Sequence, residues 1–198
     1  MTEQDTRTQI LMAATAVFAE KGFAKASMND IVRASGLSKG GVYWHFKSKD
    51  ELVTAVFDAF FAEQIAYLDA ILAGEGTAQD KLLRFTHESA AALAELAAQF
   101  PSSLEFYALA ARHDSLREEL STYFYQYQER ITGLITQGIA AGEWRSVPAE
   151  ETARTFISLF EGALLVWSIL PEAFALDRQL ETAVTLLLNG LQSEEKPA

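Results

Sequence analysis

The sequence contains no cysteine, and its four prolines all lie beyond residue 100. Without cysteine the chain cannot form a disulfide framework, a thiolate nucleophile or a Cys-ligated metal site. No apolar run reaches the roughly 18–20 residues that a membrane-spanning helix needs. The start of the chain, residues 1–5, is polar and lacks the basic region of a secretory signal. We therefore expect a cytoplasmic protein.

Basic side chains are scarce, since 16 Lys and Arg residues stand against 27 Asp and Glu residues, a net charge of −11. An evenly acidic protein would be repelled by the phosphates of nucleic acid. The charge is uneven, however: residues 21–49 carry six basic side chains and one acid, Asp30, and residues 51–198 have a net charge of −13. This asymmetry indicates different partners for the two parts, although chance clustering on a solvated face would give the same counts.

The apolar pattern predicts an all-α protein. Ile10, Ala14 and Phe18 recur on one helical face, Gly22 is a suitable helix stop, and alternating β-patterns are absent. Five residues followed by an acid three positions later mark helix starts: Ser27, Ser48, Thr77, Ser102 and Ser115. The predicted helices cover residues 6–21, 28–35, 39–45, 48–72, 78–99, 102–112, 115–141, 149–170 and 177–191.

Residues 27–49, SMNDIVRASGLSKGGVYWHFKSK, predict two short helices joined by a turn at Gly36, which is the helix-turn-helix arrangement. We expect its small core to contain Ile31, Val32, Ala34, Leu37, Val42 and Phe46. Gly40 and Gly41 are costly in the first turn of a helix, by about 1 kcal/mol each relative to Ala. Glycine there suits a helix end that must approach DNA closely, with its amides toward phosphates or base edges.

An ordinary helical subdomain with a buried aromatic cluster is the alternative interpretation of residues 27–49. Aromatic side chains at the adjacent positions 43–46 cannot all face one core, so at least one or two are exposed beside lysines. Lys47 and Lys49 lie near the start of the next helix, where amides and ammonium groups can jointly hold a phosphate. These features favour nucleic-acid binding.

The run from Ile10 to Leu52 resembles the DNA-binding region of the TetR/AcrR family of one-component transcriptional regulators. The matching pieces are FAEKGF at residues 18–23, Ser27, Ile31, ASGLSKG at residues 34–40 and YWHFKSKDEL at residues 43–52. The resemblance implies nine helices, with a DNA-binding domain at residues 1–47 and an effector-binding and dimerisation domain at residues 48–198. It also implies a non-enzymatic regulator, most often a repressor that binds a palindromic operator as a homodimer.

By position, the resemblance makes residues 38–45 the recognition helix. Ser27, Tyr43, His45 and Lys49 are then expected at phosphates, and Lys39, Gly40, Gly41 and Trp44 near bases. The full set expected at DNA is Ser27, Ser38, Lys39, Gly40, Gly41, Tyr43, Trp44, His45, Lys47 and Lys49. No cofactor and no metal ion are expected.

The last two predicted helices are apolar on nearly every face, which is typical of a core or an oligomer interface. The resemblance assigns them to a four-helix dimer interface; the alternative is that they form the core of one protomer. The residues expected at the interface are Phe156, Phe160, Ala163, Leu180, Val184, Leu187, Leu188 and Leu191.

The middle helices are rich in aromatic residues interleaved with polar ones, a pattern that suits a cavity for a small apolar or aromatic effector. A well-packed aromatic core would show the same composition. The residues expected at the effector are Phe60, Phe61, Gln64, Thr86, Ser89, Phe106, Tyr107, Tyr123, Tyr127, Phe160, Leu164 and Trp167. A ligand there would release DNA by tilting the fourth helix, provided that it prefers the state that does not bind DNA.

Two other functional classes compete with a DNA-binding regulator. An enzyme is disfavoured because His45, His87 and His113 lack metal-ligand spacing and no G-x-S-x-G motif occurs. A helical scaffold protein would show no salt-dependent binding to duplex DNA. The effector and the operator sequence are not encoded in any motif.

Overall fold

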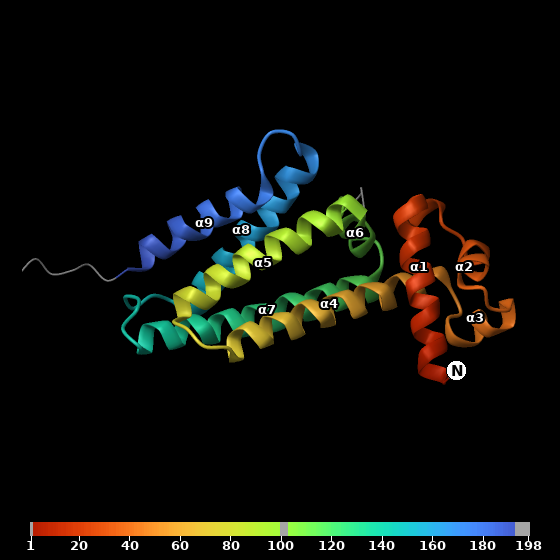
Figure 1. Ribbon diagram of the computed structural model, residues 1–198, viewed down its shortest axis with the longest axis horizontal. Helices are drawn as coiled ribbons and strands as arrows, with labels where there is room; N and C mark the ends of the chain where they lie inside the picture. The colour runs from red at the N-terminus through yellow and green to blue at the C-terminus, as the bar shows by residue number, and fades with distance from the viewer. Residues whose placement is uncertain (1, 100–102, 193–198) are drawn as a thin grey trace, which may run out of the picture. The chain divides into compact units, whose positions relative to one another are not determined.

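The computed structural model describes residues 2–99 and 103–192, with side chains described for residues 2–93 and 107–192. This part of the chain is built from helices without strands (Figure 1). In chain order the helices are α1 (Glu3–Lys25), α2 (Met28–Ser35), α3 (Lys39–His45), α4 (Lys49–Ala73), α5 (Ala78–Gln99), α6 (Ser103–Ala110), α7 (Asp114–Ala140), α8 (Ala149–Ile169) and α9 (Leu176–Leu191). The predicted all-α fold is confirmed, and except at α1 the predicted bounds lie within two residues of these.

Helix α1 is longer than its predicted range at both ends. Thr2 and Asp5 form a capping box that starts the helix before residue 6. At the other end the helical course breaks at Gly22, whose φ of 74° and ψ of 161° are non-helical. Phe23 then turns back and its ring packs 5.1 Å from that of Phe18. The predicted stop at Gly22 is thus a kink, with one further turn beyond it.

The other predicted helix starts have different outcomes. Ser27 forms a complete capping box with Asp30, and Thr77 exchanges both bonds with Asp80. Ser48 accepts from the Glu51 N–H at 3.1 Å, but the Glu51 carboxylate turns to Lys47 instead. The prediction for Ser115 is wrong because α7 already begins at Asp114. Ser102 lies outside the described residues.

The chain folds into two compact units that do not follow the predicted division at residue 47. The first unit comprises Met1–Glu63 and Gln99–Leu120, and the second comprises Gln64–Ala98 and Ser121–Ala198. The first unit extends past the predicted boundary because Leu52, Val53 and Val56 of α4 join the core of α1–α3. Ala110 and Leu116 join the same core from far along the chain, which local sequence could not reveal.

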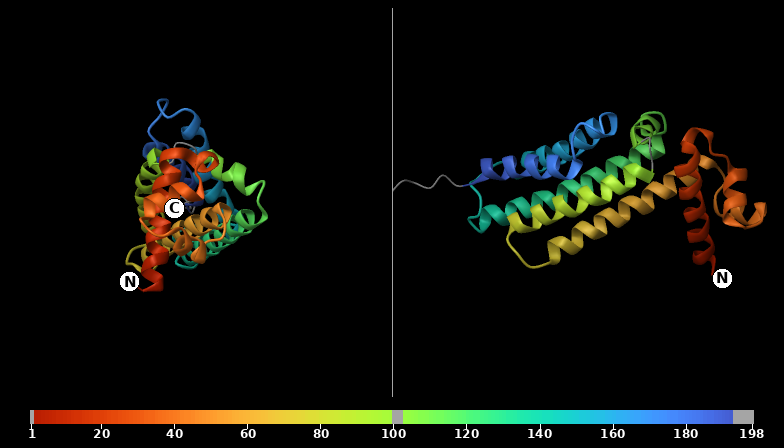
Figure 2. Two further views of the ribbon diagram at one scale, coloured as in Figure 1. Left: turned by 90° about the vertical axis from the view of Figure 1, so that its right-hand side faces the viewer. Right: turned by 45° about the horizontal axis from the view of Figure 1, so that its top comes forward.

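The second unit packs around aromatic and aliphatic side chains from α4, α5, α7, α8 and α9. Helices α8 and α9 pack against each other, as the right view of Figure 2 shows, and bury one face each. None of the described helices combines the length and the apolar character needed to cross a lipid bilayer.

A tight corner closes the second unit where α7 meets the loop before α8. The Glu143 carboxylate accepts hydrogen bonds from the Ala78 and Gln79 N–H groups at 3.1 and 3.2 Å, which caps α5. Next to it, the buried Trp144 ring lies directly on Gly138 of α7. A Cβ at Gly138 would lie 2.5 Å from the ring, so only glycine fits.

We predict that Gly138→Ala lowers the free energy of unfolding by about 1–3 kcal/mol, because the new methyl group overpacks the corner against Trp144. Chemical denaturation monitored by circular dichroism measures this change.

Gly133→Ala is the matched control on the same helix, because a Cβ there meets nothing within 4 Å. It should stabilise the protein by up to about 1 kcal/mol through helix propensity alone. Equal effects of the two substitutions would contradict the packing described for Gly138.

Candidate nucleic-acid interface and effector region

Helices α2 and α3 form the predicted helix-turn-helix within the first unit. The turn between them depends on Gly36, which adopts φ 69° and ψ 7°, a left-handed conformation that glycine tolerates best. Ile31 and Val42 are fully buried and Phe46 nearly so, while Val32 and Leu37 are packed against them. Five of the six predicted core residues are therefore confirmed.

Ala34 is the exception, because it is exposed and its neighbour Ser35 is buried instead. Ser35 lies one turn after Ile31 and so shares its buried face. Its carbonyl accepts a hydrogen bond of 2.8 Å from the Gln9 side chain, which ties α2 to α1. The apolar character of Ala34 misled the prediction, whereas the helical period alone would have selected Ser35.

The start of α3 is open on its outer side. The Ser38 hydroxyl accepts from the Gly41 N–H at 3.1 Å and so caps the helix. A Cβ at Gly40 would meet no atom within 4 Å, and the φ of Gly40 is negative. The fold of the protein itself therefore gives no reason for glycine at position 40. Lys39 is exposed, and its ammonium nitrogen lies 5.6 Å from the centre of the Tyr43 ring.

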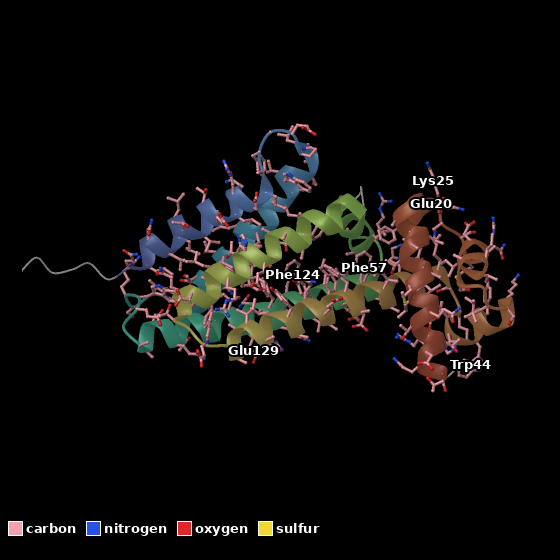
Figure 3. All side chains as sticks on the ribbon, viewed as in Figure 1. Glu20, Lys25, Trp44, Phe57, Phe124 and Glu129 are labelled. Atoms are coloured by element: carbon pink, nitrogen blue, oxygen red, sulfur yellow. The ribbon has the colours of Figure 1, made fainter. Side chains whose placement is uncertain are left out.

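The aromatic run of α3 is split between the core and the surface. Phe46 is buried beneath the Arg7 guanidinium, which lies 5.4 Å from its ring centre. Trp44, labelled in Figure 3, is 60% exposed and has the His45 ring edge-on at 4.6 Å. Tyr43 and His45 are half-buried. The alternative interpretation, an ordinary helical subdomain with a buried aromatic cluster, does not account for the exposed Trp44.

Ser27, expected at a phosphate, is part of the cap of α2. Its hydroxyl accepts from the Asp30 N–H and donates 2.6 Å to the Asp30 carboxylate. Lys21 also bonds that carboxylate at 2.7 Å, and Arg33 lies 3.4 Å from it. The Lys21 ammonium, with Ser27, lowers the pKa of Asp30 from 3.8 to about 2. Asp30 is thus the partner of two of the six basic side chains in residues 21–49.

Lys47 and Lys49 are also engaged with their own protein. The Lys47 ammonium donates to the carbonyl oxygens of Tyr43 and Trp44 at 2.8 and 2.9 Å. The Lys49 ammonium donates to those of Phe23 and Ala24 at 2.8 and 3.2 Å. Both lysines were expected at DNA. The contacts of Lys49 had no signal in the sequence because its partners lie 25 and 26 positions away.

The residues expected at an effector fall into both compact units. Phe60, Phe61 and Tyr107 belong to the first, where the Phe60 and Phe61 rings lie 5.6 Å apart and Tyr107 is 37% exposed. Phe106 lies outside the side chains that the structure describes. The others, Gln64, Thr86, Ser89, Tyr123, Tyr127, Phe160, Leu164 and Trp167, belong to the second unit.

An aromatic layer fills the second unit around Phe85, a residue that the sequence analysis did not select. Its ring lies 5.5 Å from Tyr127, 6.4 Å from Phe156 and 5.9 Å from Phe160. Tyr123 stacks on Tyr127 at 5.9 Å with an interplanar angle of 7°. Helix α5 therefore contributes the central ring, one turn before Ser89.

Polar groups lie within or beside this layer. The Ser89 hydroxyl is buried and has no hydrogen-bond partner among the described residues, whereas Thr86 donates to the Leu82 carbonyl at 2.7 Å. Burial raises the pKa of Tyr123 and Tyr127, and the negative charge of Glu161 raises both further. A buried hydroxyl without a partner is costly, so a ligand that supplied one would gain affinity.

The residues expected at a dimer interface lie mostly inside the protomer. Six of its eight residues, Phe156, Phe160, Leu180, Val184, Leu188 and Leu191, are at most 5% exposed inside a single protomer. They belong to the hydrophobic core of the second unit. Ala163 and Leu187 are half-buried. The opposite faces of α8 and α9 expose large apolar side chains, Leu165, Val166, Ile169 and Leu186, and Leu170 just after α8 is exposed as well.

The histidines outside α3 form isolated pairs. His87 Nδ1 lies 2.9 Å from Glu181 Oε1, and His113 Nδ1 lies 3.8 Å from Asp50 Oδ2. Within the described part of the chain, no three His, Asp or Glu side chains come together as a metal site.

Comparison with known families gives two matches along the chain. Residues 10–56 match the model of bacterial regulatory proteins of the tetR family. Residues 78–191 match the C-terminal domain of BetI-type transcriptional repressors. The HTH-type transcriptional regulator YfiR of Bacillus subtilis (strain 168) is 29% identical over 204 residues, which cover 96% of this chain and 94% of YfiR.

Solved structures share the fold. The transcriptional regulator FadR from Bacillus subtilis, in complex with stearoyl-CoA, has a TM-score of 0.76 and 21% identity, covering 93% of this chain and 99% of FadR. SmeT, the repressor of the multidrug efflux pump SmeDEF of Stenotrophomonas maltophilia, has a TM-score of 0.79 and 23% identity. That match covers 97% of this chain and 93% of SmeT.

Proposed function

Because the chain belongs to the tetR family of bacterial regulatory proteins, whose members are DNA-binding regulators and not enzymes, we propose which of its surfaces carry out regulation. In this proposal a cytoplasmic homodimer represses transcription by inserting α3 of each protomer into a palindromic operator. A small apolar or aromatic effector then releases it from DNA. Two-fold symmetry would present the two α3 helices to major-groove faces about 34–36 Å apart.

The observation that carries the DNA-binding part of the proposal is the open start of α3. Gly40 has empty space where a side chain would be, its φ does not require glycine, and Lys39 is exposed beside it. A glycine that costs helix stability without serving the fold is best explained by a partner that approaches the backbone. Trp44 supplies an exposed flat face for base edges.

The effector site is proposed at the aromatic layer of the second unit. Ser89, Tyr127 and Glu161 add polar character to a region otherwise lined by Phe85 and Phe160. Such a combination orients a largely apolar ligand through a few polar contacts. The similar protein FadR has been solved with stearoyl-CoA and SmeT with triclosan, which gives two probes for this site.

The dimer interface is proposed on the exposed faces of α8 and α9. Leu165, Val166 and Ile169 follow one another at helical spacing on α8, and Leu186 of α9 is 66% exposed. Apolar patches of this kind on a protein surface mark association sites. The proposed interface therefore lies opposite the face that the sequence had suggested.

Helix α4 is the proposed connection between effector and DNA. It begins at Lys49, four residues after α3 ends, and continues through Glu63 into the second unit. A ligand that shifts α4 would therefore move the two recognition helices out of register. This requires the ligand to bind the released state more tightly than the DNA-bound state.

We predict that Gly40→Ala stabilises the folded protein by up to about 1 kcal/mol and weakens operator binding at least tenfold, because the methyl group improves the helix but blocks close approach. The operator is a duplex selected from a random pool with the wild-type protein, and its affinity is measured by fluorescence anisotropy. Gly133→Ala, a similar gain in helix propensity far along the chain, should leave that affinity unchanged. Unchanged operator affinity in Gly40→Ala would refute the proposed approach.

For the effector, a panel of apolar compounds that includes stearoyl-CoA and triclosan is screened by thermal shift. A compound at about 100 times its Kd should stabilise the protein by about 2.7 kcal/mol, and it should release the operator. Ser89→Ala should weaken the binding of that compound about tenfold, because one hydrogen bond is lost. Thr132→Val, which also removes a buried hydroxyl without a partner among the described residues, should not. A ligand that saturates the protein and leaves its operator affinity unchanged would contradict the release mechanism.

For the dimer, Leu186→Glu should convert the protein to monomers at micromolar concentration, because it places charge in the proposed apolar interface. Sedimentation equilibrium measures the change. Tyr125→Glu is the control, since Tyr125 is 73% exposed and lies on α7, outside the proposed interface. Dimerisation that survives Leu186→Glu, or fails equally in both variants, would rule out the assigned face.

A further inference from the structure

Helix α8 has an acidic side chain at the edge of its buried face. Ile157 and Phe160 are buried on that face, and Leu164 packs against the same core one turn further on. Glu161 lies four residues after Ile157 and three before Leu164, and it is half-buried. The other two acids of α8 are exposed in its first turn. Glu161 is therefore the acid of this helix that lies beside the core.

Two tyrosine rings of α7 lie close enough to feel the charge of Glu161. Tyr123 and Tyr127 stack with their centroids 5.9 Å apart, and the Tyr127 ring lies 5.5 Å from that of Phe85 in the aromatic layer. Burial raises the pKa of both phenol groups, and the negative charge of Glu161 raises each of them further. The phenol groups therefore stay neutral, and the carboxylate places a formal charge beside the stacked rings.

A carboxylate next to stacked aromatic rings distinguishes ligands by their charge. An ammonium group is attracted by the carboxylate and by the electron-rich faces of the rings, and both attractions strengthen where water is excluded. The same charge repels a ligand carboxylate and has little effect on a neutral hydroxyl group. The buried Ser89 hydroxyl does not make this distinction, because it can both donate and accept a hydrogen bond.

We propose that Glu161 determines the charge of the effector that the second unit accepts, so that an apolar molecule with an ammonium group is favoured over one with a carboxylate. This inference rests on the effector site proposed above and adds the charge of its ligand. Within that site the rings supply apolar contact, Ser89 supplies a hydrogen bond and Glu161 selects the charge. In the effector panel it disfavours stearoyl-CoA, whose phosphate groups are anionic.

Three ligands that share one apolar chain test the proposed selection: decylammonium, decanol and decanoate. Each is titrated into the full chain by calorimetry, below the concentration at which it forms micelles. The wild-type protein should bind decylammonium about tenfold more tightly than decanol, and decanol about tenfold more tightly than decanoate, because each step makes the ligand more negative by one unit of charge. Ser89→Ala should weaken the binding of decanol, which would locate the ligand in the aromatic layer.

Glu161→Gln keeps the shape of the side chain and removes its charge. It should weaken the binding of decylammonium about tenfold, strengthen that of decanoate about tenfold and leave that of decanol unchanged. Glu161→Asp, which keeps the charge, should retain the wild-type order of the three ligands. Glu151→Gln is the matched control on α8, because it removes the same charge from an exposed position and should change none of the three affinities. Circular dichroism shows whether each variant is folded.

The inference is overturned if the wild-type protein binds decanoate as tightly as decylammonium, an outcome that needs no variant to fold. It is also overturned if the ligand order is unchanged in Glu161→Gln, as for an acid that only solvates the edge of α8. Equal changes in Glu161→Gln and Glu151→Gln would assign the preference to the net acidity of the chain and would contradict a specific role of Glu161.

The same titrations separate this inference from the effector site on which it rests. Decanol binding that Ser89→Ala weakens, combined with no preference for charge, would support the site and contradict only the role of Glu161. If none of the three ligands and no compound of the effector panel binds, the site and the role of Glu161 are both contradicted.

Discussion

Helix α3 is too short to be stable by itself, and the rest of the first unit holds it in place. The helix has seven residues, and two of them are glycines in its first turn. Isolated helices shorter than about 12–15 residues are marginal in water even when their composition is favourable. The position of α3 must therefore come from its neighbours. Ser38 caps one end, Lys47 closes the other, and Val42 and Phe46 anchor its inner side in the core.

This dependence changes how the charge of the segment is understood. Counted along the sequence, residues 21–49 look like a basic surface set in an acidic protein. In the structure, Lys21 and Arg33 meet Asp30, while Lys47 and Lys49 meet backbone carbonyls. A basic residue in this segment can therefore stabilise the position of the recognition helix as well as contact a phosphate. The count of charges sets the long-range attraction, and the geometry decides which of them can reach a partner.

Features that depend on a few neighbouring residues were predictable from the sequence. The caps at Ser27 and Thr77 were predictable, because each bond spans three residues. Features that depend on distant residues were not. Ala110 and Leu116 join the core of α1–α3 from more than 60 residues away, so the full extent of the first compact unit was not visible in the local sequence. On α8 and α9 both faces are apolar, and composition could not tell which face the rest of the protomer covers. Phe85 was not predicted as the centre of the aromatic layer, because composition alone does not show which aromatic side chains face one another.

The aromatic layer constrains how any effector could act. The rings of Phe85, Phe156 and Phe160 pack closely, with centroids 4.9–6.4 Å apart. A ligand that enters must therefore displace rings, which costs packing energy. The unpartnered Ser89 hydroxyl offers part of the compensation. Since the rings belong to α5 and α8, and Phe85 also packs against Tyr127 of α7, displacing them changes how these helices pack. A ligand that binds by such repacking has different affinities for the two packings, which is the condition that a regulatory switch must meet.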